Sequence, residues 1–468
     1  MKIRPTPQDH EEQERWQASG LRHRILAGQW AQDLRQDLSQ FFAPQVVARM
    51  TCPDLSRNLL LSYVRQVDLL YRAPDGVPVL VGGEPLVAPE IVTPYLWPVR
   101  GKAQRYALGM GEGLVRLDWI DGQVACRPVT SDRVVALADP QHPDVPIRIE
   151  ELVERSGPAG DLWTWEIWDI RDPESPIFRI ESIDDKGMHH DVTTTYIDTT
   201  GYPYRDTAGK PILPYILCHA EVGRSLWHEN IHAEIVSGTL RVASLWTFWT
   251  TGVRDAAHPQ RYGMDIEIPS GVVPSRDGVE YLPMDQTSIL PLRSKGDKQG
   301  SLGTLPPAMD VKLTAEAIQA YAAGCLVDAG LAASSVQIEG SSAQSGYALA
   351  ISKEGQRAAA MAQVPAAKMA DQQLLATAAR MANAYAKTTY PEQPEAYSIA
   401  YPDVGRSTQE QNAAIERATK LLAAGLISPV EAKRLIQPEL SVEEAVKALV
   451  EGADFTALIR EISGPKLT

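Results

Sequence analysis

At 468 residues, with 44% hydrophobic and 22% charged residues, the chain can bury a substantial core, and its composition excludes a disordered protein. Its formal net charge of −14 opposes tight binding to phosphate and argues against a sequence-specific DNA-binding protein, although an acidic wall can surround DNA without gripping it. Four widely spaced cysteines without a C-x-x-C pair favour a reducing cytoplasm over a disulfide scaffold or a zinc ribbon.

The N-terminal sequence has no signal-peptide pattern. The longest apolar-looking stretch, at 238–253, contains Arg241 and is shorter than the ~20 residues that a bilayer span needs. We therefore expect a soluble protein that neither enters a membrane nor is secreted.

The first half of the chain predicts helices followed by a β region. Helical periodicity indicates one or two helices within 8–42 and another at 54–71. Alternating segments at 113–120 and 123–129, joined by Asp121-Gly122, predict a hairpin. Further strands are expected at 161–168, 177–183 and 193–198.

Three tryptophans lie within one of these expected strands, at Trp163, Trp165 and Trp168. Such a group can form a sugar-binding platform. Aromatic side chains also fill the half-buried faces of strands, and we favour this second interpretation.

The helical period returns at 225–251 and is followed by a Pro- and Gly-rich span at 258–307. Strand-like pieces at 265–268, 279–282 and 287–292 make this span a compact insertion. A second helix is expected at 310–329, where Gly330 stops it, and a loop rich in Ser and Gln follows. The next helix opens at Gly346, should kink or break at Pro365, and ends before Pro391.

The last sixty or so residues are predicted to be helical throughout. Strings of the form S/T-x-x-E begin at Ser407, Ser428 and Ser441, and each matches a capping box, in which a hydroxyl and a carboxylate satisfy backbone donors at a helix start. Gly425 and Gly452 are expected helix stops. Three short helices should therefore end the chain.

The string H-E-x-x-H occurs at His228, Glu229 and His232. On a helix, this spacing lets two imidazoles share a zinc ion while the glutamate activates a water. A catalytic zinc needs a third protein ligand, but the extended motif fails at Ile235 and Gly238, and no Glu lies between positions 235 and 266. A zinc-dependent hydrolase is therefore the second hypothesis. We favour the interpretation that His228, Glu229 and His232 are polar residues at a helix start or between subunits.

The chain contains no phosphate-binding loop, no dinucleotide fingerprint after a strand and no nucleophile elbow. Paired carboxylates such as Asp184-Asp185 stand in turn-like sequence, where surface charge is the common role. We therefore expect no enzyme activity, no cofactor and no metal.

Five segments then occur in a characteristic order. They are the early helix at 55–71, the sequence G-K-P-I-L-P-Y at 209–215, the Pro-rich insertion ending near Pro307, the S-G-Y-A-L helix opening at 345–349 and the A-G-L-I-S turn at 424–428. Their order and spacing, over roughly 45–450, resemble the portal proteins of tailed bacteriophages with siphovirus-type and myovirus-type heads. The resemblance implies a helix-rich α+β fold that forms rings.

The resemblance also implies a division of the chain. The parts would be N-terminal helices (1–42), a wing of helices and β structure (43–222), a first stem helix (223–255), a clip (256–307), a second stem helix (308–330), a channel loop (331–345), a long kinked helix with the wing return (346–404) and a helical crown (405–468).

A portal subunit would form a ring of about twelve copies at one capsid vertex, a conduit for DNA packaging and ejection. The implied partners are other copies of the chain, double-stranded DNA held non-specifically, the major capsid protein, the terminase large subunit and a head-tail adaptor. The ring would belong to a virion assembled in the bacterial cytoplasm. A different ring-forming head-tail connector is a third hypothesis, although adaptors are usually much shorter.

Two groups of residues would carry contacts in such a ring. Helix 310–329 would line the channel, and small polar groups of the channel loop would meet DNA through water-mediated contacts without sequence readout. These loop residues are Ser334, Ser335, Gln337, Ser341, Ser342 and Gln344. In the clip, Arg293, Lys295 and Lys298 would meet phosphate or an acidic partner, and a solvated loop is an equal alternative.

Overall fold

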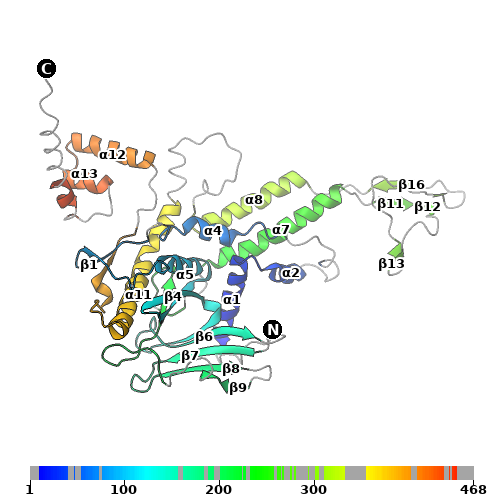
Figure 1. The fold of residues 1–468 in the computed structure, drawn as a ribbon. Helices are drawn as coiled ribbons and strands as arrows, with labels where there is room; N and C mark the ends of the chain where they lie inside the picture. Colours follow the sequence, from blue (N-terminus) through cyan, green and yellow to red (C-terminus); the bar gives the residue numbers. More distant parts are fainter. Residues whose placement is uncertain are drawn as a thin grey trace. The chain divides into compact units, whose positions relative to one another are not determined.

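The computed structural model describes residues 10–40, 47, 54–72, 76–156, 162–183, 188–193, 201–223, 225–227, 232–257, 310–331, 355–401, 408–436, 442 and 445–450, and six short strands between 261 and 304. The chain divides into two compact units (Figure 1). Unit 1 comprises Met1–His23, Leu61–His232 and Leu326–Thr468, and unit 2 comprises Arg24–Leu60 and Ala233–Cys325. Helices and sheets are mixed, in agreement with the expected α+β class.

Unit 1 contains a five-stranded antiparallel sheet in sequential order. Its strands are β5 (Val134–Ala138), β6 (Pro146–Ser156), β7 (Leu162–Asp169), β8 (Ile177–Ile183) and β9 (His189–Asp191). Helix α1 (His10–Leu26) places Trp16 against this sheet, where its ring stacks on Trp165 with centroids 5.9 Å apart. Trp165 and Trp168 are almost fully buried, which confirms strand packing for these two residues.

A second sheet of unit 1 has the order β10-β3-β4. It is built from β3 (Glu112–Ile120), β4 (Gln123–Thr130), which leads into η1 (Ser131–Arg133), and β10 (Tyr215–His219). Asp121 and Gly122 join β3 to β4 with φ angles of 52° and 79°, the positive values that a two-residue hairpin of this twist requires. The predicted hairpin is therefore confirmed.

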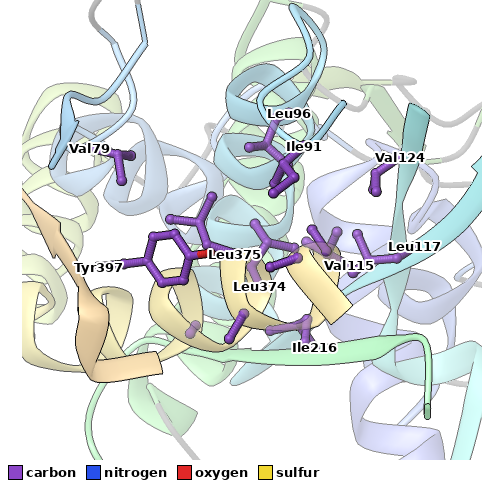
Figure 2. Packing of buried hydrophobic residues seen from close by; sticks show 14 of the residues in the cluster. Val79, Ile91, Leu96, Val115, Leu117, Val124, Ile216, Leu374, Leu375 and Tyr397 are labelled. Atoms are coloured by element: carbon purple, nitrogen blue, oxygen red, sulfur yellow. The ribbon is translucent and has the colours of Figure 1, made fainter. Parts of the chain in front are cut away.

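The core of unit 1 lies around helix α11 (Val364–Tyr385) and helix α5 (Leu96–Met110). Figure 2 shows Leu374 and Leu375 of α11 beside Val115 of β3 and Ile216 of β10. A third sheet covers this core with β1 (Val79–Val81), β2 (Glu84–Pro85) and β17 (Tyr397–Ile399), which η2 (Pro394–Ala396) precedes. Many of the buried positions of α11 are alanine, and small side chains let other elements approach closely.

Pro365 acts as predicted. A helical run at 355–362 stops at Gln363, and α11 begins at Val364 with the proline in its first turn. Proline is tolerated there because the first turn lacks hydrogen-bond partners for its N–H groups. Positions 346–354, where this helix was expected to open, lie outside the described residues.

The C-terminal helices of unit 1 include α12 (Thr408–Ala423) and α13 (Pro429–Ile436). Gly425 follows α12 with a φ of 71°, as its predicted role requires. The backbone N–H of Glu431 donates to Ser428 Oγ at 3.2 Å, and Ser428 N donates to Glu431 Oε2 at 2.7 Å. This capping box is confirmed, and those at Ser407 and Ser441 lie outside the described residues.

Unit 2 is built from α2 (Ala31–Ser39), α7 (Ala233–Ala257) and α8 (Val311–Asp328), and α4 (Leu59–Val67) begins in it. Three antiparallel strand pairs lie between α7 and α8 in the sequence: β11 (Arg261–Met264) with β16 (Ser301–Thr304), β12 (Ile266–Glu267) with β15 (Arg293–Ser294), and β13 (Ser275–Arg276) with β14 (Val279–Glu280). β12 and β14 fall within two expected strands, and 287–292 lies outside the described residues.

Three expected elements have different bounds. The helix expected at 54–71 covers only Leu59–Val67, because the Asp54 carboxylate accepts from Ser56 N at 2.9 Å and holds a turn instead. The helix expected from position 225 begins at Ala233, because His232 has a φ of 56°, which no α-helix contains. The strand expected at 193–198 is wrong at Thr193, since β9 ends at Asp191, and 194–198 lies outside the described residues.

Within the described part of the chain, no helix is long and apolar enough to cross a bilayer. The eight-part division implied by the portal resemblance stays a prediction.

A buried ion pair joins the two central helices of unit 1. Arg100 of α5 donates to Asp371 of α11, and neither side chain reaches solvent. The hydroxyls of Tyr71 and Tyr401 each donate to the other oxygen of Asp371 at 2.7 Å. Burial lowers the pKa of Arg100, but the Asp371 carboxylate outweighs it, and the pKa stays above its usual value. Burial raises the pKa of Tyr71 and Tyr401, so both remain protonated donors.

The network extends to the helix break. Arg100 donates through Nη1 to Gln104 Oε1 at 2.9 Å, and Gln104 Nε2 donates to Gln363 Oε1 at 3.3 Å. Gln363 Nε2 donates to the carbonyl of Val67 at 3.1 Å. The interruption before α11 is therefore held by side chains that lead back to the ion pair.

The change Asp371→Ala should destabilise unit 1 severely, because it leaves a buried guanidinium without its counter-charge. We expect a loss of about 3–5 kcal/mol in the free energy of unfolding, measured by denaturant titration. The double change Arg100→Met with Asp371→Leu should lose much less, because it removes both charges. A loss of under about 1 kcal/mol for the single change, as for an exposed ion pair, would contradict this assignment.

Candidate functional site

Helices α7 and α8 of unit 2 form an antiparallel pair that brackets the inserted strands (Figure 1). Near the start of α7, Gly238 lies against Cys325 near the end of α8, and a Cβ at Gly238 would stand 2.8 Å from Cys325 Sγ. Towards the far end of α7, Trp249 Nε1 donates to the carbonyl of Val311, the first residue of α8, at 2.8 Å. Glycine at 238 thus allows a close crossing of the two helices.

Buried hydroxyls on one face of α7 fix the rest of unit 2. Thr239 Oγ1 accepts from the backbone N–H of Leu60 at 3.1 Å, and Thr247 Oγ1 accepts from Asp54 N at 3.2 Å. Ser244 Oγ donates to a carboxylate oxygen of Asp37 in α2 at 2.9 Å. Both threonines also donate to backbone carbonyls one turn earlier in α7 at 2.8 Å, so each hydroxyl is used twice. α7 is therefore the central scaffold of unit 2.

These hydroxyls were not anticipated as contacts. In the sequence all three lie within the apolar-looking stretch at 238–253. The sequence signal for these contacts was their spacing, since Thr239, Ser244 and Thr247 lie on one side of a helix, and polar residues on a buried side need partners.

The described residues cover helix α8 on one side. Ile318, Cys325 and Leu326 are its buried apolar residues, and much of the remaining surface is exposed. Tyr321 borders the covered side, where partial burial and the neighbouring Cys325 raise the pKa of its hydroxyl. The helix pair therefore carries mostly apolar and small side chains and few charged ones, which suits packing against other protein surfaces.

The H-E-x-x-H string does not lie within α7. His232 precedes the first residue of α7 in the left-handed region, and its ring packs on Tyr63 with centroids 4.5 Å apart. It lines a cavity of about 240 Å³ together with Tyr63 and Gln363. His228 and Glu229 lie outside the described residues, so the zinc hypothesis stays a prediction. Among the residues that are described, no three His, Cys, Asp or Glu side chains come together as a metal site.

The predicted contact residues of the loop and the clip are mostly beyond the described ranges. Ser334, Ser335, Gln337, Ser341, Ser342 and Gln344 all fall within 332–354. Arg293 lies in β15, where its backbone pairs with Glu267 of β12, and its side chain is not described. Lys295 and Lys298 also lie outside the described residues. The DNA-facing and clip roles therefore stay predictions.

Two glycines of the helix pair provide a matched test of its packing. Gly238→Val should lower the free energy of unfolding by about 1–3 kcal/mol, because its side chain would overlap Cys325. At Gly324 of α8 no atom of the described residues lies within 4 Å of an added Cβ, so Gly324→Val should change the stability of the unassembled chain by no more than about 0.5 kcal/mol. Thermal and denaturant unfolding would measure both. Equal effects at the two positions would contradict the close crossing.

Comparison with known proteins finds similarity to solved structures. No family model matches the chain, and no curated protein matches it. A solved structure described as the neck of an empty GTA particle, computed with C6 symmetry, is similar over 80% of this chain and 88% of its own, with 15% sequence identity and a TM-score of 0.40. At that identity and TM-score the likeness carries no functional argument, which must come from the residues of this chain.

Proposed function

We propose that this chain is the subunit of a phage portal, a ring at one capsid vertex through which DNA enters and leaves the head. The ordered resemblance of its sequence to portal proteins is the main support. The observation in the fold that supports it most is the antiparallel pair α7 and α8, which encloses a β insertion and is followed by a helix broken at Gln363. This is the element order that the resemblance implies.

The physical properties of the chain suit a conduit. Identical subunits that contact head to tail close into a ring when the rotation between neighbours divides a full turn, and the hole follows from the number of copies. A net charge of −14 per chain keeps phosphate from binding tightly along the path. DNA could then slide, because no deep electrostatic well would hold it.

The position of such a ring at one capsid vertex determines its expected partners. The terminase large subunit would dock during packaging, a head-tail adaptor would dock afterwards, and the major capsid protein would surround the ring. A different ring-forming connector of the head-tail junction would also form a ring, but it would not bind the terminase. Binding of the terminase therefore distinguishes these two proposals.

Electron microscopy of the purified chain tests the ring directly. We expect closed particles with a central hole and about twelve copies, and native mass spectrometry should give a whole-number multiple of 51.3 kDa. Monomers only, or particles without a hole under conditions that favour assembly, would refute the portal proposal.

Metal analysis of the same preparation tests the hydrolase alternative. That alternative predicts about one zinc per chain, lost on the double change His228→Ala with His232→Ala. The portal proposal predicts that this double variant still forms rings.

A further inference from the structure

Two sheets of unit 1 meet at a group of charged side chains. In the sheet β10-β3-β4, Arg116 of β3 stands directly opposite Arg127 of β4. In the five-stranded sheet, Glu151 of β6 stands directly opposite Glu166 of β7. Like charges in opposite positions of neighbouring strands repel each other, so each pair is unfavourable within its own sheet and is stabilised by the other sheet. We call these four residues and the neighbouring Asp118 the charge cluster.

Glu151 is bonded through both of its carboxylate oxygens. Arg127 donates to Oε1 at 2.6 Å and to Oε2 at 2.7 Å. The hydroxyl of Tyr215 in β10 also donates to Oε2, at 2.8 Å, and Nη1 of Arg116 lies 3.4 Å from the same oxygen. The negative charge of Glu151 is therefore well compensated, although its side chain is only 1% exposed.

Glu166 is bonded through one oxygen only. Nη1 of Arg116 donates to Oε2, and Nε1 of Trp168 donates to the same oxygen at 3.3 Å. Oε1 of Glu166 has no hydrogen-bond partner among the described residues. The side chain is 14% exposed, so solvent reaches it. A proton can therefore be added at Oε1 while both hydrogen bonds at Oε2 persist.

The charge cluster contains more carboxylates than guanidinium groups. The two guanidinium groups are those of Arg116 and Arg127, and the three carboxylates are those of Asp118, Glu151 and Glu166. Solvent stabilises the charge of Asp118, which is 21% exposed. Burial raises the pKa of Glu166, the Arg116 guanidinium partly offsets this rise, and the Glu151 carboxylate adds to it. Glu166 is therefore the carboxylate whose charge is least favourable.

The other groups around Glu166 do not balance the extra negative charge. Tyr215 and Tyr204 are neutral donors, because burial raises the pKa of both hydroxyls, that of Tyr204 to about 12. Ile180 of β8 stands opposite Glu166 on its other side and is apolar. Uptake of one proton would leave two charges of each sign in the charge cluster.

We infer that Glu166 exchanges a proton with solvent and that the bound proton strengthens the contact between the two sheets. The uncharged carboxyl no longer repels Glu151, and it still accepts from Arg116 and Trp168. A carboxyl whose pKa is higher in the folded chain than the ~4.3 of an unperturbed glutamate stabilises the folded chain fully below that value. This contribution is lost as the pH rises through the folded value, so the contact weakens at higher pH. Such a proton switch lies within unit 1 and would operate whatever the function of the chain.

The isosteric change Glu166→Gln tests the proton switch, because glutamine imitates the protonated carboxyl at every pH. At pH 8 it should raise the melting temperature of the full chain by about 2–4 °C, since it removes the repulsion from Glu151. Glu151→Gln is the matched control. It removes the same charge from the opposite strand, but it disrupts the paired hydrogen bonds from Arg127 and should therefore lower the melting temperature.

The effect of Glu166→Gln should also depend on pH. The difference in melting temperature from the unchanged chain should disappear near pH 4, where the unchanged chain carries the proton itself. Hydrogen exchange measured by mass spectrometry gives a local readout. At pH 8, peptides from β3 and β7 should exchange more slowly in Glu166→Gln than in the unchanged chain, and at pH 4 they should exchange at equal rates.

Three results would overturn the proton switch. A lower melting temperature of Glu166→Gln at pH 8, with faster exchange in β3 and β7, would show that the sheets require the charged carboxylate. A difference of equal size at pH 4 and pH 8 would show that Glu166 exchanges no proton between them. A higher melting temperature for both variants would show an effect of net charge alone. Failure of Glu151→Gln to fold agrees with its expected loss of stability, and the exchange comparison for Glu166→Gln then decides.

Discussion

The buried pair of Arg100 and Asp371 is the interaction on which the arrangement of unit 1 depends. Two charges without solvent are costly unless their hydrogen-bonding atoms find partners. Here Arg100 Nε and Nη1 and both oxygens of Asp371 are bonded, and only Nη2 of Arg100 has no partner among the described residues, so the pair fixes the positions of its neighbours. Tyr71 lies after α4 in the sequence, and Tyr401 lies after β17. Both hydroxyls donate to the Asp371 carboxylate, so this one side chain of α11 binds an early and a late segment of the chain. Hydrogen bonds through the side-chain amides of Gln104 and Gln363 connect Arg100 to the helix break before α11. The core is thereby organised by polar contacts as well as by apolar packing.

Local rules in the sequence predicted the elements that are governed by local chemistry. Asp121-Gly122 permits a tight hairpin, and the Ser428 and Glu431 side chains cap a helix, whatever lies elsewhere in the chain. Helix α5 was not predicted, because Pro98 and Gly101 within it are weak helix formers. Pro98 fits for a local reason, because it stands in the first turn, where the backbone N–H groups lack partners in the helix. Gly101 fits for a tertiary reason, because an added Cβ would lie 3.0 Å from Cβ of Tyr71.

Long-range pairings could not be read from the sequence. Arg100 and Asp371 are 271 positions apart, and charged residues on helices are usually solvated, so nothing local distinguished them from surface residues. The candidate site shows the same limit. The sequence predicted α8 within one residue of its start and end, but its covered and open sides are set by the crossing at Gly238, which no periodicity reveals.

Unit 2 depends on close approach and on buried hydroxyls in the same way. Gly238 leaves room for Cys325, so α8 crosses α7 where any larger side chain would overlap Sγ. On another part of α7, the hydroxyls of Thr239, Ser244 and Thr247 bind the backbone at the start of α4, a side chain of α2 and the backbone of the segment before α4. A hydroxyl without such a partner would be costly when buried, so these contacts specify which segments α7 can pack against.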